Sequence, residues 1–352
     1  MIDIIIFMNK EYIFRADGNA HIGVGHIMRC LTIADALADK VAREAILFVC
    51  SDTDSAQIAE KRGYEALVLD TDYKEMEAEL KLWPQLSINN AVILVDSYYI
   101  TDSYLKALSD YGKVILMDDM QNHSYSVDGV INYNIFADSD IYQRLYHDTD
   151  KCYLGCAYAP IRKQFIDVKY VVKSKITDIL ITTGGADSLN IAGTLYDSLN
   201  NTSAIDSSIN YHIVSGIFNP FYNELKDKEA LAGNLRIYHN VSNMAELMQK
   251  CDVAITAAGS TVYELAAIGV PMITLSYADN QVAGAEYIGQ HIATNAGKYD
   301  KDPQSVINNI KAALIDEYSD IEYRKLCKQK ENKLVDGLGA NRIADILISY
   351  KL

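Results

Sequence analysis

A glycine-containing segment near the start of the chain begins with an aspartate and ends with a histidine, Asp17-Gly18-Asn19-Ala20-His21-Ile22-Gly23-Val24-Gly25-His26. Gly23 and Gly25 carry no Cβ, so the backbone can turn sharply there and come close to a ligand. Residues 27–37 follow with apolar side chains at helical spacing, and the free N–H groups at the start of that helix favour an anion. Histidine titrates near about pH 6.5, so His26 suits a base at neutral pH. We predict a catalytic loop; the alternative is an ordinary glycine turn with His26 hydrogen-bonded to it.

A second glycine pair follows an apolar segment in the middle of the chain, Ile181-Thr182-Thr183-Gly184-Gly185-Ala186-Asp187. A helix is expected from about residue 189, so Gly184 and Gly185 predict another turn that receives an anion. The segment lacks the Gly-Lys-Ser/Thr ending of a nucleoside-triphosphate loop.

A third segment, Gly259-Ser260-Thr261-Val262-Tyr263-Glu264, combines a glycine with two hydroxyls at an expected helix start. Backbone N–H groups and the hydroxyls of Ser260 and Thr261 would suit a diphosphate. Glu264 lies one turn further on, where its carboxylate could accept hydrogen bonds from ribose hydroxyls. The alternative is helix capping by Ser260 and Thr261, with Glu264 as a solvent-facing partner.

These segments belong to a regular alternation of short apolar strands and amphipathic helices, which is typical of parallel sheets covered by helices. The expected strands are 11–15, 45–50, 66–69, 91–95, 113–117, 129–132, 177–182, 210–214, 235–238, 252–256, 271–275 and 291–294. Two such runs predict an α/β protein with two Rossmann-like domains, 1–168 and 169–335. Residues 303–352 are expected to be helical, and a last helix within 336–352 is expected to pack back on the first domain.

Composition favours a soluble globular protein, with 49% hydrophobic and 22% charged residues among 352. A net charge of −15 argues against nucleic acid and anionic membranes as partners. Six dispersed cysteines favour reduced thiols in a cytoplasmic protein, and the pair Cys152 and Cys156 has no histidine nearby that would complete a zinc site. No apolar run reaches the roughly 20 residues that span a bilayer. We expect a monomer, with residues 1–7 a dispensable extension or an upstream start.

The segment from Ala257 to Pro271, followed by Asn280 and Gln281, resembles the nucleotide-sugar half of glycosyltransferases that add N-acetylglucosamine in peptidoglycan synthesis. That resemblance implies a GT-B-like fold, in which two Rossmann-like domains face each other across a cleft. Arg15-x-Asp17 and Ile22-Gly23-x-Gly25-His26-Ile27-x-Arg29 closely resemble the UDP-sugar hydrolases of pseudaminic acid biosynthesis. Further matching motifs are Val95-Asp96-Ser97-Tyr98, Asp118-Asp119, Tyr158-Ala159-x-Ile161-Arg162-x-x-Phe165, Gly184-Gly185-x-Asp187, Glu264 and Asn280-Gln281. The similarity covers roughly residues 11 to 300 and extends to spore-coat polysaccharide proteins.

The resemblance implies that water attacks the anomeric carbon of a UDP-linked 2,4-diacetamido-2,4,6-trideoxy sugar and expels UDP with inversion, without a metal or cofactor. His26 would be the general base. Backbone donors at Ser260–Thr261 and Gly184–Gly185 would stabilise the charge that develops on the β-phosphate.

Other residues of the matching motifs receive roles with alternatives. Asp17 would orient His26 or accept a sugar hydroxyl, or else cap a turn. Tyr98 would contact the sugar, although Tyr99 beside it is a second candidate. Arg29 shares a helix face with His26 and would touch phosphate or pair with an acid.

Asn280 would bind an acetamido group or a sugar hydroxyl, or else cap the helix before Gln281. The substrate-binding set implied by the family also contains four residues without individual roles, namely Arg15, Gly23, Gly25 and Gln281.

Two other functions remain open at this stage. A glycosyltransferase would use the same UDP half, but it needs an acceptor site. The acidic chain has no Lys/Arg cluster near residues 60–110 to form a basic-apolar face for a lipid-linked acceptor. A nucleotide-sugar sensor would have no need of His26 and Asp17.

Overall fold

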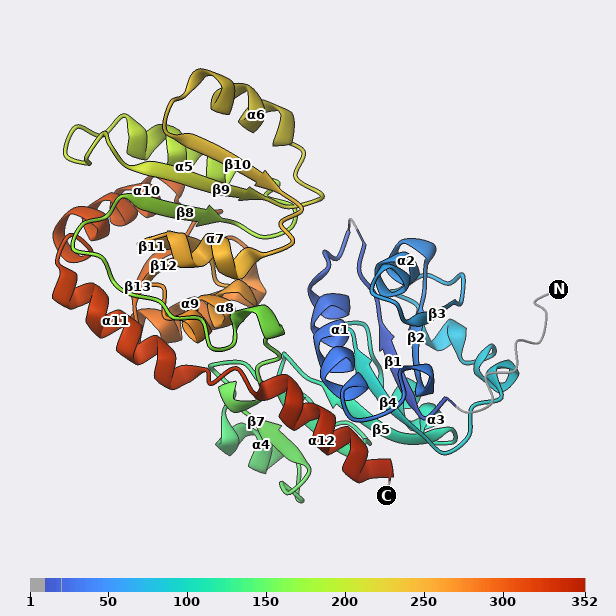
Figure 1. The fold of residues 1–352 in the computed structure, drawn as a ribbon. Coiled ribbons are helices and arrows are strands. Elements are labelled where there is room, and N and C mark those ends of the chain that lie inside the picture. Colours follow the sequence, from blue (N-terminus) through green and yellow to red (C-terminus); the bar gives the residue numbers. More distant parts are fainter. Residues whose placement is uncertain (1–9, 20, 352) are drawn as a thin grey trace. The chain divides into compact units, whose positions relative to one another are not determined.

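The computed structural model describes residues 10–19 and 21–351, so the expectation for residues 1–7 lies outside the described part. The chain divides into two compact units. Unit 1 comprises the residues up to Pro160 together with those from Leu338 onward, and unit 2 comprises Ile161–Gly337. The sequence placed these boundaries at 168/169 and 335/336. Within each unit a sheet is covered by helices on both faces (Figure 1).

Unit 1 contains a seven-stranded parallel sheet in the order β3-β2-β1-β4-β5-β6-β7. Its strands are β1 (Tyr12–Ala16), β2 (Ile46–Cys50), β3 (Glu65–Val68), β4 (Ala91–Asp96), β5 (Gly112–Met117), β6 (Gly129–Asn132) and β7 (Cys152–Leu154). The first six lie at the predicted places. The sequence missed β7, which is a three-residue edge strand too short for a periodic signal.

The helices of unit 1 are α1 (Gly25–Ala38), α2 (Thr53–Lys61), α3 (Asp102–Leu108), α4 (Ser139–Leu145) and α12 (Gly339–Lys351). Short 3-10 turns lie at η1 (Arg43–Ala45), η2 (Met76–Glu79), η3 (Trp83–Leu86) and η4 (Cys156–Tyr158). The last helix, α12, packs against α1, β4 and β5. Its Tyr350 hydroxyl donates to the Asp128 carbonyl at 2.8 Å, and Lys351 Nζ donates to the Asn90 carbonyl at 2.7 Å. The end of the chain thus covers the face of the sheet that carries α1.

Unit 2 contains a six-stranded parallel sheet in the order β10-β9-β8-β11-β12-β13. Its strands are β8 (Asp178–Thr182), β9 (Asn210–Ser215), β10 (Leu235–His239), β11 (Val253–Ala257), β12 (Met272–Ser276) and β13 (Thr294–Lys298). The last strand begins where the predicted 291–294 strand ends. Ile292 and Ala293 are buried in the turn before it, so their apolar character marks that turn rather than the strand.

The helices of unit 2 are α5 (Ile191–Asn200), α6 (Tyr222–Leu231), α7 (Met244–Lys250), α8 (Thr261–Ile268), α9 (Asp279–His291), α10 (Pro303–Ala312) and α11 (Ile321–Leu334). A 3-10 turn η5 (Lys163–Phe165) precedes the sheet, and a π-helical turn η6 (Ala313–Glu317) follows α10. Each helix in the described part of the chain is too short or too polar to cross a membrane.

Both sheets share one strand order, in which the first strand lies between the second and the fourth. Chain connections leave β1 and β4, and likewise β8 and β11, toward opposite sides of their sheets. In open α/β sheets, ligands bind beyond the carboxyl ends of the strands at such a switch point. The glycine segments after β1, β8 and β11 all lie at these two places.

Helix α11 contributes a buried carboxyl group to the core of unit 2. Glu331 has no exposed surface, and its Oε1 accepts a hydrogen bond from the Met272 backbone N–H at 3.2 Å. Oε2 has no hydrogen-bond partner. Burial raises the pKa of Glu331 well above its ordinary value, and the Met272 bond offsets only part of that rise.

We expect Glu331→Gln to stabilise the protein more at pH 8 than at pH 5. Unfolding returns the carboxyl to its ordinary pKa near 4.5. Wild-type stability therefore falls as pH rises from there toward the raised pKa of the folded state, by up to about 1.4 kcal/mol per pH unit. Glutamine does not ionise and escapes this loss. Urea unfolding at both pH values measures the change in unfolding free energy that each substitution causes. For Glu322→Gln, at an exposed position of the same helix, this change should be the same at pH 5 and pH 8. Equal behaviour of the two variants would contradict the prediction.

Candidate functional site

An imidazole and a carboxylate meet at the switch point of unit 1. His26 lies in the first turn of α1 and is 8% exposed, and its Nδ1 is 2.6 Å from Oδ1 of Asp96. Asp96 is the last residue of β4, which pairs with β1. Burial alone would raise the pKa of Asp96, but Arg29 and His26 outweigh it and hold that pKa well below its ordinary value. An ionised carboxylate only accepts hydrogen bonds, so Nδ1 carries the proton and Nε2 presents its lone pair.

Nε2 of His26 makes no hydrogen bond to any residue in the described part of the chain. A histidine whose Nδ1–H is held by a carboxylate while Nε2 is open has the geometry of a general base. The alternative in which His26 bonds to its own glycine loop is therefore not what the structure shows. The partner on Nδ1 is Asp96 and not Asp17, for which orienting His26 was one of the predicted alternatives.

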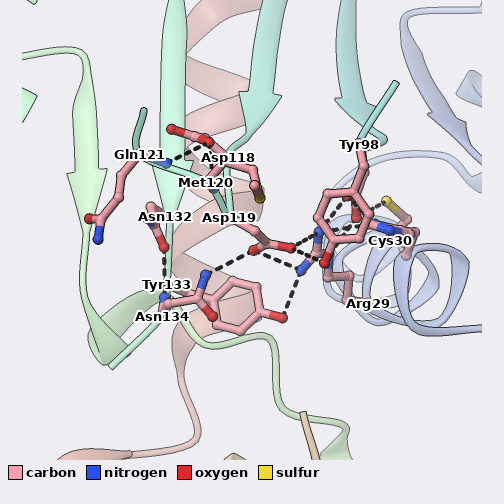
Figure 2. A network of polar contacts seen from close by, with 12 residues as sticks. Arg29, Cys30, Tyr98, Asp118, Asp119, Met120, Gln121, Asn132, Tyr133 and Asn134 are labelled. Atoms are coloured by element: carbon pink, nitrogen blue, oxygen red, sulfur yellow. Dashed lines mark hydrogen bonds and ion pairs between the residues drawn. The ribbon is translucent and has the colours of Figure 1, made fainter. Parts of the chain in front are cut away.

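Arg29, one turn after His26 on α1, bridges the carboxylates of Asp96 and Asp119, and Figure 2 shows its contact with Asp119. Its Nε and Nη2 lie 2.5 Å from the two oxygens of Asp96, and Nη1 and Nη2 donate to Asp119 at 3.1 and 2.8 Å. Nη1 also donates to the Tyr133 hydroxyl at 2.9 Å. The guanidinium is only 10% exposed. Of the two roles predicted for Arg29, the structure shows the pairing with acids.

Tyr98, rather than Tyr99, faces the imidazole. The Tyr98 ring meets the His26 ring edge to face with centroids 4.5 Å apart, and its hydroxyl donates to Asp119 Oδ2 at 3.2 Å. Tyr98 is 45% exposed, so one side of its ring is open to a ligand. Tyr99 packs instead on Tyr73, at 5.5 Å between ring centroids.

Arg15 and Asp17 form a buried ion-pair network on the opposite side of β1. Arg15 has no exposed surface; its Nε and Nη2 donate to Glu79 at 2.8 and 2.9 Å, and its Nη1 donates to Asp17 at 2.6 Å. Asp17 also accepts from the backbone N–H and hydroxyl of Ser51 at 2.7 and 3.0 Å. The substrate-binding role of Arg15 stays a prediction, while in this structure the guanidinium is enclosed and its nitrogens donate to Glu79 and Asp17. Asp17 fixes the ends of β1 and β2.

The glycine loop between β1 and α1 is held by a side-chain turn. Asn19 Oδ1 accepts from the backbone N–H groups of His21 and Ile22 at 2.9 and 3.2 Å, and Asn19 Nδ2 donates to Asp52 at 2.9 Å. Gly23 has φ of +75°, which favours glycine. Gly25 does not, and a Cβ there would meet open space, so Gly25 leaves room above the helix start.

The turn after β8 is occupied by its own carboxylate. Asp187 accepts from the N–H groups of Ile191 and Ala192, the first residues of α5, at 2.8 and 3.1 Å. The N–H groups at the start of α5, which were predicted to bind an anion of a ligand, therefore bind the carboxylate of Asp187 instead. Gly184 adopts φ of +91° and is exposed, and Gly185 is half-buried, so their backbone remains accessible.

The turn after β11 is open. Ser260 is exposed at the N-terminus of α8, and no side chain caps that helix. The capping role considered for Ser260 and Thr261 is thus absent. Glu264 pairs with Arg162, whose Nε and Nη2 both donate to Oε1 at 2.9 and 2.7 Å. Burial raises the pKa of Glu264 despite Arg162. Arg162 itself lies over the Phe165 ring, 4.9 Å from its centroid.

Asn280 and Gln281 begin α9 in different ways. Asn280 is exposed, and the residue at the cap position is Ala278, so Asn280 does not cap the helix. Gln281 Oε1 accepts from the Tyr277 backbone N–H at 3.0 Å, which fixes the turn before the helix. The Tyr277 hydroxyl in turn donates to the Thr183 carbonyl at 2.9 Å, linking this turn to the one after β8.

Sequence reasoning quoted Asp96, Asp119 and Arg162 in motifs but assigned them no role in the site. The signal that could have found the two aspartates is positional, since each follows a strand close to β1 in the sheet. The described residues contain no group of three or more His, Cys, Asp or Glu side chains arranged to hold a metal ion.

Comparisons with known proteins match this architecture. Residues 178–337 match the glycosyltransferase family 28 C-terminal domain, within unit 2. The chain is 26% identical over 292 residues to UDP-2,4-diacetamido-2,4,6-trideoxy-beta-L-altropyranose hydrolase of Campylobacter jejuni, covering 80% of this chain and 96% of that protein. It is 24% identical over 343 residues to spore coat polysaccharide biosynthesis protein SpsG of Bacillus subtilis, covering 94% and 96%. The chain is therefore similar to both of these proteins over most of its length.

The chain is also similar to part of a longer protein. An uncharacterized protein of Methanocaldococcus jannaschii is 28% identical over 270 residues, a match covering 74% of this chain but only 54% of that relative. The chain thus spans about half of that relative's length. Among solved structures, Acinetobacter baumannii MurG has a TM-score of 0.66 at 15% identity, with 97% of this chain and 99% of that chain covered. Anabaena HepE in complex with UDP and glucose has a TM-score of 0.57 at 12% identity, with 97% and 99% covered. These likenesses confirm the predicted GT-B-like fold class.

We expect Arg15→Met to lower the free energy of unfolding by about 3–5 kcal/mol, because the change leaves Glu79 and Asp17 buried without a counter-charge. Urea unfolding measures the loss. The matched control is Arg62→Met, which breaks an exposed pair with Asp35 and should cost less than about 1 kcal/mol. Wild-type stability of Arg15→Met together with lost ligand binding would return Arg15 to the binding set.

Proposed function

We propose that this protein hydrolyses a UDP-linked 2,4-diacetamido-2,4,6-trideoxy sugar to the free sugar and UDP, as a step of pseudaminic acid biosynthesis. The observation that carries the proposal is the Asp96–His26 pair, with Nε2 open at the switch point of unit 1. The name of the Campylobacter jejuni relative supports the substrate class.

In the proposed reaction, His26 Nε2 takes a proton from water as the water oxygen bonds to the anomeric carbon. The bond between that carbon and the β-phosphate oxygen breaks, and UDP leaves with the electron pair. Asp96 stabilises the imidazolium that forms and keeps its ring in one orientation. Each base of this kind contributes about 10²–10⁴-fold to rate.

UDP binding falls to unit 2 in this proposal. The uncapped start of α8 at Ser260 and Thr261 supplies donors for the diphosphate, and backbone donors near Gly184 and Gly185 supplement them. Glu264 Oε2 accepts no hydrogen bond from the described residues and is assigned to a ribose hydroxyl, while Arg162 holds Oε1. Exposed Asn280 is assigned to the sugar's polar substituents.

A UDP-sugar-dependent glycosyltransferase is the second candidate. It is favoured by the glycosyltransferase family 28 match over residues 178–337 and by the likeness to MurG. The two functions share the nucleotide half and differ in what attacks the anomeric carbon, water or an acceptor hydroxyl.

We expect the protein to release UDP from the UDP-sugar when water is the only nucleophile supplied, and to do so with EDTA present. Coupled detection of UDP measures this. Release that requires an added acceptor would establish the transferase instead, and binding without release would indicate a sensor. Activity that disappears with EDTA and returns with a divalent ion would contradict the metal-free mechanism.

His26→Asn and Asp96→Asn should each lower kcat by about 10²–10⁴-fold while UDP affinity stays unchanged, because both act on the proton transfer. The matched control is His212→Asn in unit 2. His212 is also buried, and its Nε2 lies 2.8 Å from a carboxylate oxygen of Asp178. That variant should keep wild-type kcat. An equal loss in His212→Asn would show that the effect is structural.

The two glycine turns of unit 2 should respond differently to an added charge. Ser260→Asp places a carboxylate at the open start of α8 and should weaken UDP binding about tenfold or more through like-charge repulsion. Ser188→Asp adds the same charge beside the α5 turn, where Asp187 already occupies the helix start, and should have little effect. Titration calorimetry with UDP compares the two, and a reversed order would assign the diphosphate to the α5 turn.

A further inference from the structure

Five side chains, that of His26 included, form a closed circuit of contacts, and Figure 2 labels three of its members, Arg29, Tyr98 and Asp119. The contacts run from His26 to Asp96, from Asp96 to Arg29, from Arg29 to Asp119, from Asp119 to the Tyr98 hydroxyl, and from the Tyr98 ring back to His26. The members come from α1 (His26 and Arg29), the end of β4 and the segment after it (Asp96 and Tyr98), and the segment after β5 (Asp119). A change in one member therefore reaches the imidazole from two directions.

Charge alternates along this circuit. Arg29 Nη2 lies 3.1 Å from His26 Nδ1, so its positive charge opposes protonation of the imidazole, while Asp96 favours it. Asp119 lies on the far side of Arg29 and accepts from both of its terminal nitrogens. Asp119 thereby offsets the guanidinium charge without touching His26.

Two other titratable groups in contact with this circuit, Cys30 and Tyr133, are neutral at the working pH. Burial raises the pKa of the Cys30 thiol far above its ordinary value, and raises the pKa of Tyr133 to about 12. Asn134 holds Asp119 from the other side, donating from Nδ2 at 2.9 Å, and carries no charge. Asp118 lines the same pocket but is held away from the circuit, accepting from the Tyr142 hydroxyl at 2.5 Å and from the Met120 N–H at 2.9 Å. The charged groups within the circuit are those of Asp96, Arg29 and Asp119.

We infer that Arg29 and Asp119 are positioning residues that act as an opposed charge pair on His26, Arg29 limiting how readily the imidazole accepts a proton and Asp119 restoring part of that tendency through Arg29. Its meaning for catalysis rests on the proposed hydrolase function. The inference itself concerns the protonation of one histidine and needs no substrate.

The test is an NMR titration of the full chain with isotope-labelled histidine, without ligand, in which the signal absent from His26→Asn identifies His26. Removing the positive charge in Arg29→Gln should raise the titration midpoint of His26 by about 1–2 pH units. Removing the negative charge in Asp119→Asn should lower it by about 0.5–1 unit. A loss of structure alone would not shift the midpoint in opposite directions.

Two controls show whether a shift of the His26 midpoint comes from the changed charge, from a lost hydrogen bond, or from a change of charge elsewhere on the protein. Tyr133→Phe removes a hydrogen bond to Arg29 without changing charge and should leave the midpoint unmoved. Asp345→Asn removes one carboxylate at an exposed pair with Lys40 and should also leave it unmoved. Shifts of the same sign in Arg29→Gln and Asp119→Asn, or shifts no larger than that of Asp345→Asn, overturn the inference.

Asp119→Asn still tests the inference if Arg29→Gln does not fold, because the loss of this negative charge must lower the midpoint of His26, whereas Asp345→Asn must not. Signals of the other histidines report folding in every variant. If wild-type protein releases no UDP from the UDP-sugar, the proposed function fails while the titration result stands. If UDP is released and the midpoints do not separate, the charge pair fails and the hydrolase remains.

Discussion

A single carboxylate, that of Asp96, receives both the fork of a guanidinium and the N–H of an imidazole, and unit 1 is built around this shared contact. A carboxylate buried this completely must be paired, because an isolated one costs several kcal/mol. Arg29 provides the counter-charge that keeps Asp96 ionised, and His26 donates its Nδ1–H to the same carboxylate. The two lie three residues apart on α1 and so share one face, which means that the register of α1 against β4 decides whether the imidazole has a partner.

The same strand order carries different chemistry in the two units. At the first switch point the segments after β1, β4 and β5 bring acids, an arginine and a histidine together, which suits proton transfer. At the second, the segments after β8 and β11 bring glycines and hydroxyls, which suit an anion. Asp187 accepts from the N–H groups at the start of α5, whereas no side chain caps the start of α8 in the described part of the chain. The start of α8 is therefore the better placed of the two to bind an anion. One topology thus positions two distinct sets of groups.

Strand positions and the location of His26 could be predicted from sequence, because apolar alternation and a glycine loop before a helix are local signals. The partner of His26 could not, since Asp96 lies 70 residues away and only the pairing of β1 with β4 brings the two together. The enclosure of Arg15 could not be predicted, because its partner Glu79 comes from a 3-10 turn with no recognisable pattern. Strand β7 was missed because three residues carry no periodicity.

The interrupted course of unit 1 has a consequence for how the protein is made. Residues 161–337 form a complete unit of their own, whereas α1 obtains its covering helix α12 only from residues 339–351. During synthesis, where segments generally fold in the order they emerge, the nucleotide-fold unit in the middle can therefore assemble while the earlier one still exposes one side of α1. The helix that carries His26 therefore gains this cover only once residues 339–351 have emerged.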